Sequence, residues 1–117
     1  DAASAVTRLI DMGVEPFLLS SSLLGVLAQR LVRKYCGTCH GKGCEACGHT
    51  GYAGRTGVFE LLVTDDAIRA QIHAQASEAE IRTAALAAGM TLMREDGERL
   101  IAAGITSREE VLRVTRD

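Results

Sequence analysis

The chain has 117 residues, of which 47% are hydrophobic and 24% are charged, the balance of a soluble globular protein with one domain or two small ones. Its net charge of -2 argues against a dedicated nucleic-acid binder, because such proteins usually carry a strong basic excess. No run reaches the roughly 18 apolar residues that a membrane span needs, so direct membrane insertion is not expected.

The start of the chain carries neither a methionine nor a secretory leader, and it opens directly into a helical pattern. We therefore expect a fragment of a longer protein, in a compartment that keeps cysteines reduced.

Two helices and one ambiguous segment are expected first. In residues 1–13 apolar side chains recur at helical spacing, with Asp1 as a suitable N-cap and Gly13 as a suitable end. Pro16 suits the first turn of a second helix. The apolar pattern of residues 25–35 fits either a helix or a buried strand, and periodicity alone does not separate them.

Residues 36–57 differ sharply in composition from the rest, because glycine is frequent and all four cysteines lie here. We expect a separate module without a long regular element. Residues 56–63 then predict a strand, since they are rich in β-forming side chains.

Short helices are predicted for the remainder of the chain, with N-caps or capping boxes at their starts and glycine at several ends. The expected helices are 64–76, capped by Thr64; 77–89, with a capping box of Ser77 and Glu80; 91–104; and 106–115, with a capping box of Thr106 and Glu109.

The cysteines form two CxxC pairs, Cys36 with Cys39 and Cys44 with Cys47. Two tight turns of this kind can direct four sulfurs at one ion, so the spacing predicts a structural zinc site with all four cysteines as ligands. Four thiolates close the coordination sphere, which argues against a catalytic metal. A disulfide knot and a thioredoxin-like redox pair are the weaker alternatives.

Polar residues around the cysteines have simpler expected roles. His40 and His49 are interpreted as flanking polar residues, because four thiolates suffice for zinc. Basic residues near in sequence are expected to offset the negative charge of a zinc thiolate centre: Arg33, Lys34, Lys42 and Arg55.

Two family resemblances meet at this motif. The segment "CGTCHGKG" fits the CxxCxGxG repeat of DnaJ-type chaperones, but the second repeat is imperfect and helices follow it. The segments "CEACGHTGYAGRTGVFELL" and "TRLIDMGVEPFLLSSSLLGVLAQRLVRKYC" instead resemble the C-terminal part of the secretion ATPases of type II secretion and type IV pilus assembly. The remainder, through "GMTLMREDGERLIAAGITSREEVLRVTRD", is similar to the same family, and "GVEPFLLSSSLLGVLAQRLVR" looks closer to its type II secretion member.

This resemblance implies a fold that is mainly α with small β elements. Residues 1–34 would end a RecA-like α/β ATPase domain, with a strand at "VLAQRLVR"; residues 35–57 would form a tetracysteine zinc module; and residues 58–117 would form a C-terminal helical subdomain. Family members commonly have a longer insert between the CxxC pairs, and the short connection here puts any partner contact of that loop in doubt.

The resemblance also implies a function. The parent would be a cytoplasmic homo-hexamer that hydrolyses ATP with Mg²⁺ and drives pseudopilus assembly through inner-membrane platform proteins. The phosphate-binding GxxxxGK[ST] pattern is missing from this chain, so the chain alone is expected to be inactive and to hold no catalytic residue. The alternatives are a pilus assembly ATPase and a free-standing DnaJ-like zinc-binding interaction module.

Arg8 and Arg55 match family positions that are associated with the nucleotide, so both are candidates for contacts with ATP phosphates. The alternative for Arg8 is an exposed helix face, and for Arg55 it is charge compensation at the metal. Arg30 and Arg33 are expected to be structural ion-pair partners, with a nucleotide contact as the alternative. Asp96 and Gly97 interrupt an apolar helix face, which suggests a capping or buried hydrogen bond and a close helix contact, with a partner contact as the alternative.

Overall fold

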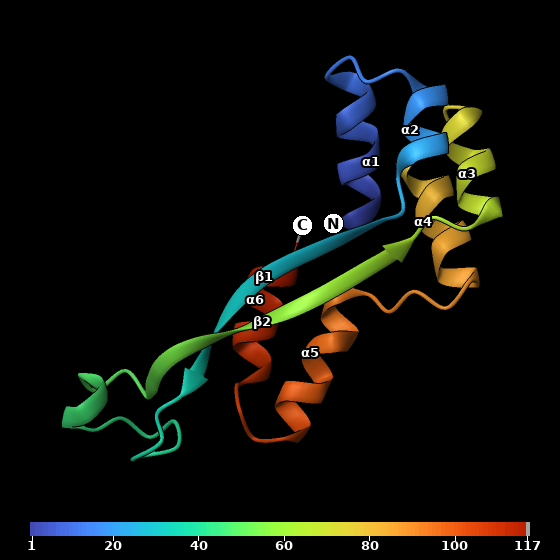
Figure 1. Cartoon of the computed structure of the whole chain (residues 1–117). Helices are drawn as coiled ribbons and strands as arrows, with labels where there is room; N and C mark the ends of the chain where they lie inside the picture. Colours follow the sequence, from blue (N-terminus) through green and yellow to red (C-terminus); the bar gives the residue numbers. More distant parts are fainter. Residues whose placement is uncertain (117) are drawn as a thin grey trace. The chain divides into compact units, whose positions relative to one another are not determined.

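The computed structural model describes residues 1–116, which form six α-helices, a short 3₁₀ helix and a two-stranded sheet (Figure 1). In chain order the elements are α1 (Ala2–Asp11), α2 (Pro16–Ser22), β1 (Gly25–Tyr35), the 3₁₀ helix η1 (Glu45–Cys47), β2 (Tyr52–Val63), α3 (Asp66–His73), α4 (Glu78–Ala87), α5 (Met93–Ala102) and α6 (Arg108–Thr115). Among the described residues, no helix has the length and apolar character needed to cross a membrane.

Two compact units divide the structure. Unit 1 comprises Asp1–Ala28 and Glu60–Leu92, and unit 2 comprises Gln29–Phe59 and the described residues from Met93 onward. The predicted domain boundaries at 1–34, 35–57 and 58–117 do not coincide with the boundaries of these two units. Helices from the first and the last of the predicted ranges pack together in unit 1. Those three domains stay a prediction about the parent protein.

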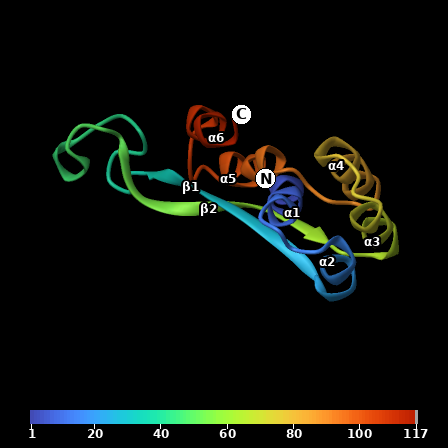
Figure 2. The same cartoon turned by 90° about the horizontal axis from the view of Figure 1, so that it is seen from above.

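Unit 1 is built from α1 to α4, in which α4 packs on α1 and α3, and α2 packs on α3. Figure 2 shows α3 and α4 side by side. Apolar residues at helical spacing make one buried core, as expected from the hydrophobic effect. Its buried members are Ala2, Ala3, Val6, Leu19, Leu62, Ile68, Ile72, Ile81 and Ala85.

The helix starts of unit 1 confirm most of the predicted caps. The backbone amide of Ser4 donates to Asp1 Oδ1 at 2.7 Å, and the capping box of Ser77 with Glu80 is present. The prediction for Thr64 was wrong: Asp65 caps α3 by accepting from the amide of Ile68 at 2.9 Å. Thr64 is instead buried, because it directly follows β2 and continues the alternation of buried side chains along that strand.

The strands are longer than the small β elements that were predicted. The ambiguous segment is strand β1, and β2 begins at Tyr52 rather than at residue 56. The expectation that residues 36–57 hold no long regular element was therefore wrong at their C-terminal end. Along β2, buried Val58 and Leu62 alternate with exposed side chains, the period of a strand with one covered face.

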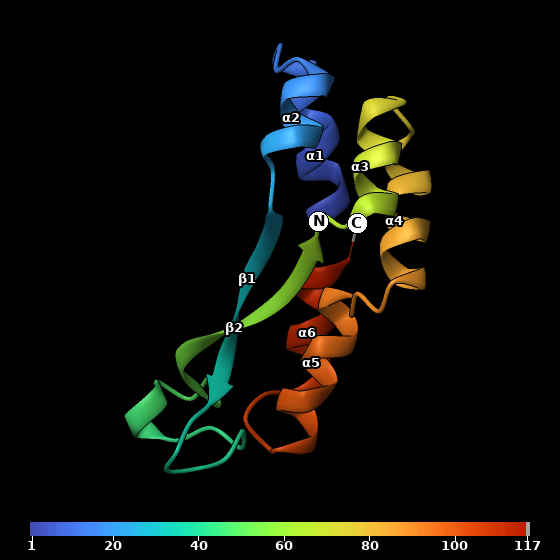
Figure 3. The same cartoon turned by 45° about the vertical axis from the view of Figure 1, so that its right-hand side comes forward.

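In unit 2, α5 and α6 pack against each other and lie side by side in Figure 3. Gly97 makes this contact possible, since a Cβ added there would lie 2.4 Å from Val111 Cγ1. The neighbouring Asp96 accepts a hydrogen bond from the amide of Phe59 at 2.8 Å. The predicted close helix contact at Gly97 is confirmed. The predicted capping or buried hydrogen bond was wrong in kind, because Asp96 accepts from a strand amide at an exposed position.

The predicted capping box of Thr106 and Glu109 was wrong by one residue. Ser107 is the N-cap of α6, and its Oγ accepts from the amide of Glu110 at 3.1 Å. Thr106 is buried, and its hydroxyl donates to the carbonyl oxygen of Arg33 at 2.6 Å. Adjacent hydroxyl residues offer two equally plausible caps in sequence, and burial of the first decides between them.

Candidate metal centre and its surroundings

The loop between β1 and β2 gathers the four cysteine sulfurs. All four Sγ atoms lie within 4.8 Å of one another. The sulfurs of Cys36 and Cys44, of Cys39 and Cys47, and of Cys44 and Cys47 are each 3.8 Å apart. These separations are far longer than the roughly 2.05 Å of a disulfide bond, so the four thiols are free.

Backbone amides of the loop point at the cysteine sulfurs, and hydrogen bonds from the backbone of Cys39 and Thr38 lower the pKa of Cys36. The amide of Gly43 donates to Cys39 Sγ at 3.2 Å, and the amides of Cys44 and Gly51 donate to Cys47 Sγ at 3.3 and 3.2 Å. A hydrogen bond from an amide to sulfur favours the thiolate over the thiol, because a negatively charged sulfur is the stronger acceptor. For Cys47, which accepts two of these hydrogen bonds, the thiolate is therefore favoured.

The thiol pKa values diverge strongly. The hydrogen bond from the amide of Cys44 lowers the pKa of Cys47 to about 6. Burial acts in the opposite direction, and the amide of Gly51 lowers the pKa further. For Cys44, the amide of Cys47 favours the thiolate, but burial and the neighbouring thiols raise the pKa to about 11. Closely packed sulfurs thus resist ionising together, a resistance that a coordinated divalent cation removes.

This donor set fits a tetrahedral zinc ion. A Zn–S bond of about 2.3 Å requires tetrahedron edges of about 3.8 Å, and three sulfur pairs have that separation. Cys36 is buried and the other three cysteines are half-buried, as a structural site requires. His40 and His49 lie outside the sulfur cluster, although both adopt the left-handed backbone conformation.

The basic residues do not all behave as predicted. Lys34, Lys42 and Arg55 are exposed and stay available to offset thiolate charge. Arg33, in contrast, pairs with Glu110, as the prediction of a structural ion pair required. The ion-pair prediction was wrong for Arg30. It has no ion pair among the described residues, and its guanidinium donates instead to the carbonyl oxygen of Val114 at 2.8 Å.

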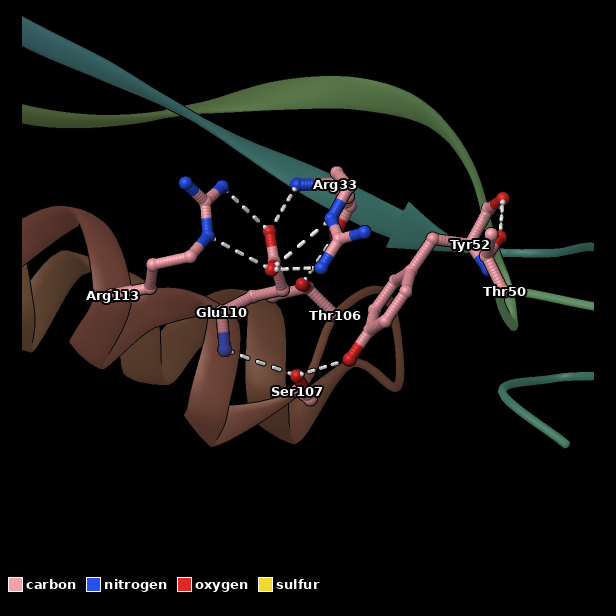
Figure 4. A network of polar contacts seen from close by, with 7 residues as sticks. All are labelled: Arg33, Thr50, Tyr52, Thr106, Ser107, Glu110 and Arg113. Atoms are coloured by element: carbon pink, nitrogen blue, oxygen red, sulfur yellow. Dashed lines mark hydrogen bonds and ion pairs between the residues drawn. The ribbon is translucent and has the colours of Figure 1, made fainter.

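A second polar cluster surrounds the buried carboxylate of Glu110 (Figure 4). Glu110 accepts from the amide and guanidinium of Arg33, at 2.9 Å and 2.7 Å, and from the guanidinium of Arg113 at 3.0 Å. The Arg113 hydrogen bond, opposed by burial and reinforced by Arg33, lowers the pKa of Glu110 to about 2. Sequence reasoning missed this cluster, because Arg33 and Glu110 are 77 positions apart.

Tyr52 connects the cluster around Glu110 with the loop that carries the four cysteines. Its ring stacks on that of Tyr35, with centroids 5.7 Å apart, and the guanidinium of Arg33 lies 4.4 Å from the Tyr52 ring centroid. The Tyr52 hydroxyl and Ser107 Oγ share a hydrogen bond of 2.8 Å (Figure 4). No sequence motif marked either tyrosine.

The two arginines predicted to contact ATP phosphates lie in different units. Arg8 is exposed on α1 in unit 1, and Arg55 is exposed on β2 in unit 2. Neither side chain has a hydrogen bond or ion pair within residues 1–116. Both remain candidates for contacts with a nucleotide.

Comparisons with known proteins cover the whole chain. The model of the family "Type II/IV secretion system protein" matches residues 1–113. The type II secretion system protein HxcR of Pseudomonas aeruginosa is 62% identical over 125 aligned positions, which cover 100% of this chain and 27% of the relative. The type II secretion system ATPase E of Vibrio cholerae is 45% identical over 141 positions, covering 99% of this chain and 28% of the relative.

Similarity also extends to pilus motors. The type IV pilus assembly ATPase PilB of Thermus thermophilus is 45% identical over 139 positions, covering 96% of this chain and 16% of the relative. A crystal structure of the pilus retraction motor PilT with bound ADP shares the fold, with a TM-score of 0.70 at 23% identity over 99% of this chain and 30% of that one.

The aligned lengths show two further facts. The chain spans little more than a quarter of the type II secretion relatives. The alignment with the Vibrio cholerae protein has 141 positions against 117 residues here, so that relative has residues with no counterpart in this chain. The family match over residues 1–113, together with relatives up to 62% identical, shows that this chain belongs to the type II/IV secretion system protein family.

Proposed function

We propose that this chain is the C-terminal region of a homo-hexameric ATPase that powers type II protein secretion by driving pseudopilus assembly. The observation that carries the proposal is the 62% identity to a type II secretion system protein along the full chain. The parent would bind ATP and Mg²⁺, and it would act in the cytoplasm at the inner membrane through secretion platform proteins. A pilus assembly ATPase is the second candidate, favoured by the 45% identity to PilB.

Within that motor, we assign residues 1–34 to the end of the RecA-like domain, 35–57 to the zinc module and 58–117 to the helical subdomain. The zinc ligands would be Cys36, Cys39, Cys44 and Cys47, whose sulfur separations support the assignment. Bound zinc would supply only structural cross-linking, because four thiolates leave no open position for a substrate. The fragment would transmit the nucleotide state to subunit contacts.

Arg8 and Arg55 would contact ATP phosphates in the assembled motor, since both are exposed arginines without a partner among the described residues. The chain lacks the phosphate-binding loop, so the isolated 117 residues should show no ATP hydrolysis, while the complete gene product should hydrolyse ATP. In the complete protein, Arg55→Ala should lower kcat at least about tenfold if its charge stabilises phosphoryl transfer. Lys42→Ala, which removes another exposed cation of the same module, is the matched control.

Complementation in the organism that encodes this chain separates the two candidate systems. Deleting the complete gene should abolish protein secretion and leave surface pili intact, and the wild-type gene should restore secretion. Cys47→Ser should fail to restore it, whereas Thr38→Ser, an exposed position between two cysteines, should succeed. Loss of pili with normal secretion would favour the pilus ATPase, and unchanged secretion and pili would overturn both candidates.

A further inference from the structure

The cysteine loop packs directly on the end of β1. The amide of Cys36 donates to the carbonyl oxygen of Gly51 at 2.8 Å, which joins the two ends of the loop. A Cβ added at Gly51 would lie 2.6 Å from Gly41 O, and one added at Gly41 would lie 2.8 Å from the Tyr35 ring. The backbone of Gly51 therefore lies against Gly41, and the backbone of Gly41 lies against the Tyr35 ring. The conformation of the loop thus determines the position of that ring.

Tyr35 and its neighbour Tyr52 link this loop to the start of α6. The Tyr35 amide donates to the carbonyl oxygen of Ile105 at 2.8 Å, and its ring stacks on Tyr52 with an interplanar angle of 9°. Tyr52 in turn shares its hydroxyl hydrogen bond with Ser107, the N-cap of α6. All these residues belong to unit 2.

The start of α6 depends on the same contacts. Ser107 Oγ accepts from the amide of Glu110 while it bonds Tyr52, and the Glu110 carboxylate accepts from Arg33, which lies against the Tyr52 ring (Figure 4). A shift of Tyr52 would therefore weaken two contacts of α6. One is the N-cap hydrogen bond of Ser107, and the other is the ion pair of Glu110 with Arg33.

We propose that metal binding by the four cysteines stabilises the docking of α6 on β1, through Tyr35 and Tyr52. The inference rests on the proposed zinc site, because bound metal would hold the loop, and Gly41 with it, against Tyr35. Coupling of this kind is reciprocal: if bound metal favours docked α6, then docked α6 raises the affinity for the metal by the same factor. The stability of α6, the helix that carries Glu110, would thus depend on whether the cysteine loop binds metal.

Hydrogen exchange in the full 117-residue chain tests the forward direction. Removing zinc with a chelator under reducing conditions should speed exchange of the α6 amides, Arg108–Thr115, by at least about fivefold. Exchange in α4, Glu78–Ala87, should change by less than about twofold, because α4 belongs to unit 1. Metal content is measured on the same samples.

Two tyrosine variants test whether the effect of metal on α6 depends on the hydrogen bond between Tyr52 and Ser107. Tyr52→Phe keeps the ring stack but loses the bond to Ser107, so α6 should exchange faster even with zinc bound, and zinc removal should have less than half its wild-type effect. Tyr35→Phe should behave as wild type, because the Tyr35 hydroxyl makes no hydrogen bond within the described residues.

Zinc affinity tests the reverse direction and does not depend on the tyrosine variants folding. Ser107→Ala should weaken zinc binding by about fivefold in competition with a chromophoric chelator, although Ser107 contacts no cysteine. Ser77→Ala, which removes an N-cap of the same type in unit 1, should leave the affinity unchanged.

The outcomes separate the two proposals. One zinc per chain with α6 exchange and Ser107→Ala affinity unaltered would overturn the coupling and leave the zinc site standing. No bound zinc in the reduced protein would overturn the zinc site and the coupling together.

Discussion

Glu110 shows how a single buried charge holds an element in place. Its side chain is 2% exposed, whereas its partners Arg33 and Arg113 are 47% and 55% exposed, so water screens the cations but not the carboxylate. Removing either arginine would leave buried charge less compensated, which costs more than the pair itself contributes.

The depressed pKa of Glu110 makes part of the stability depend on pH. Glu110→Gln should lower the free energy of unfolding by about 2 kcal/mol at pH 7, after allowance for the exposed arginines. An acid whose folded pKa lies below its unfolded pKa stabilises the fold above the unfolded value, so this contribution should disappear as the pH falls from about 4.5 to about 2.

Denaturant unfolding of the wild type and Glu110→Gln at several pH values checks this prediction. The difference between the two proteins is the quantity to compare, because acid also protonates the thiolate of Cys47, whose pKa is about 6, in both proteins. A difference that stayed constant down to pH 2 would show that packing, and not charge, explains the loss.

The start of α3 offers another test at the level of single residues. Thr64 Oγ1 is the one buried side-chain oxygen or nitrogen without a hydrogen-bond partner in the described part of the chain. Thr64→Val should therefore be neutral or raise the free energy of unfolding by about 1 kcal/mol, whereas Asp65→Ala should lower it by about 1 kcal/mol through loss of the cap. The reverse order in thermal unfolding would restore Thr64 as the cap.

Among the elements, the contact of α5 with α6 depends on a missing side chain. Glycine in a helix interior normally costs up to about 1 kcal/mol relative to alanine, yet Gly97→Ala should destabilise the protein by about 1–3 kcal/mol through overpacking against Val111. Val111→Ala should recover much of that loss in the double variant. Additive effects of the two substitutions, measured by chemical denaturation, would contradict direct contact.

Element positions were largely predictable, and their termini were not. Periodicity and caps located α1 and α4, since Asp1 and Ser77 act locally. The helix or strand ambiguity of β1 needed the family resemblance, because a short apolar run fits both structures. The start of β2 was missed, since pairing with β1 extends a strand into glycine-rich sequence that local propensity disfavours.

The same distinction holds at the site. The CxxC spacing predicted the gathering of the four sulfurs, which the structure shows, because ligands close in sequence meet in tight turns. The cluster around Glu110 joins residues far apart in the chain, and one sequence carries no signal of which arginine meets which acid. The Gly97 prediction succeeded because a glycine on an apolar helix face has few other physical explanations.

For the whole molecule, two observations support the proposal of a motor component whose cysteine loop binds a metal. The family match covers residues 1–113, and the loop between β1 and β2 places its sulfurs at the separations that a tetrahedral ion requires. Metal binding would add stability to unit 2, because the loop closes on residues that contact α6.

Native mass spectrometry of the reduced chain, purified without chelators, tests the zinc site most directly. The account predicts a mass shift of about one zinc ion per chain, lost in Cys47→Ser and retained in Thr38→Ser. A metal-free mass for the reduced wild-type chain in the presence of excess zinc would contradict it.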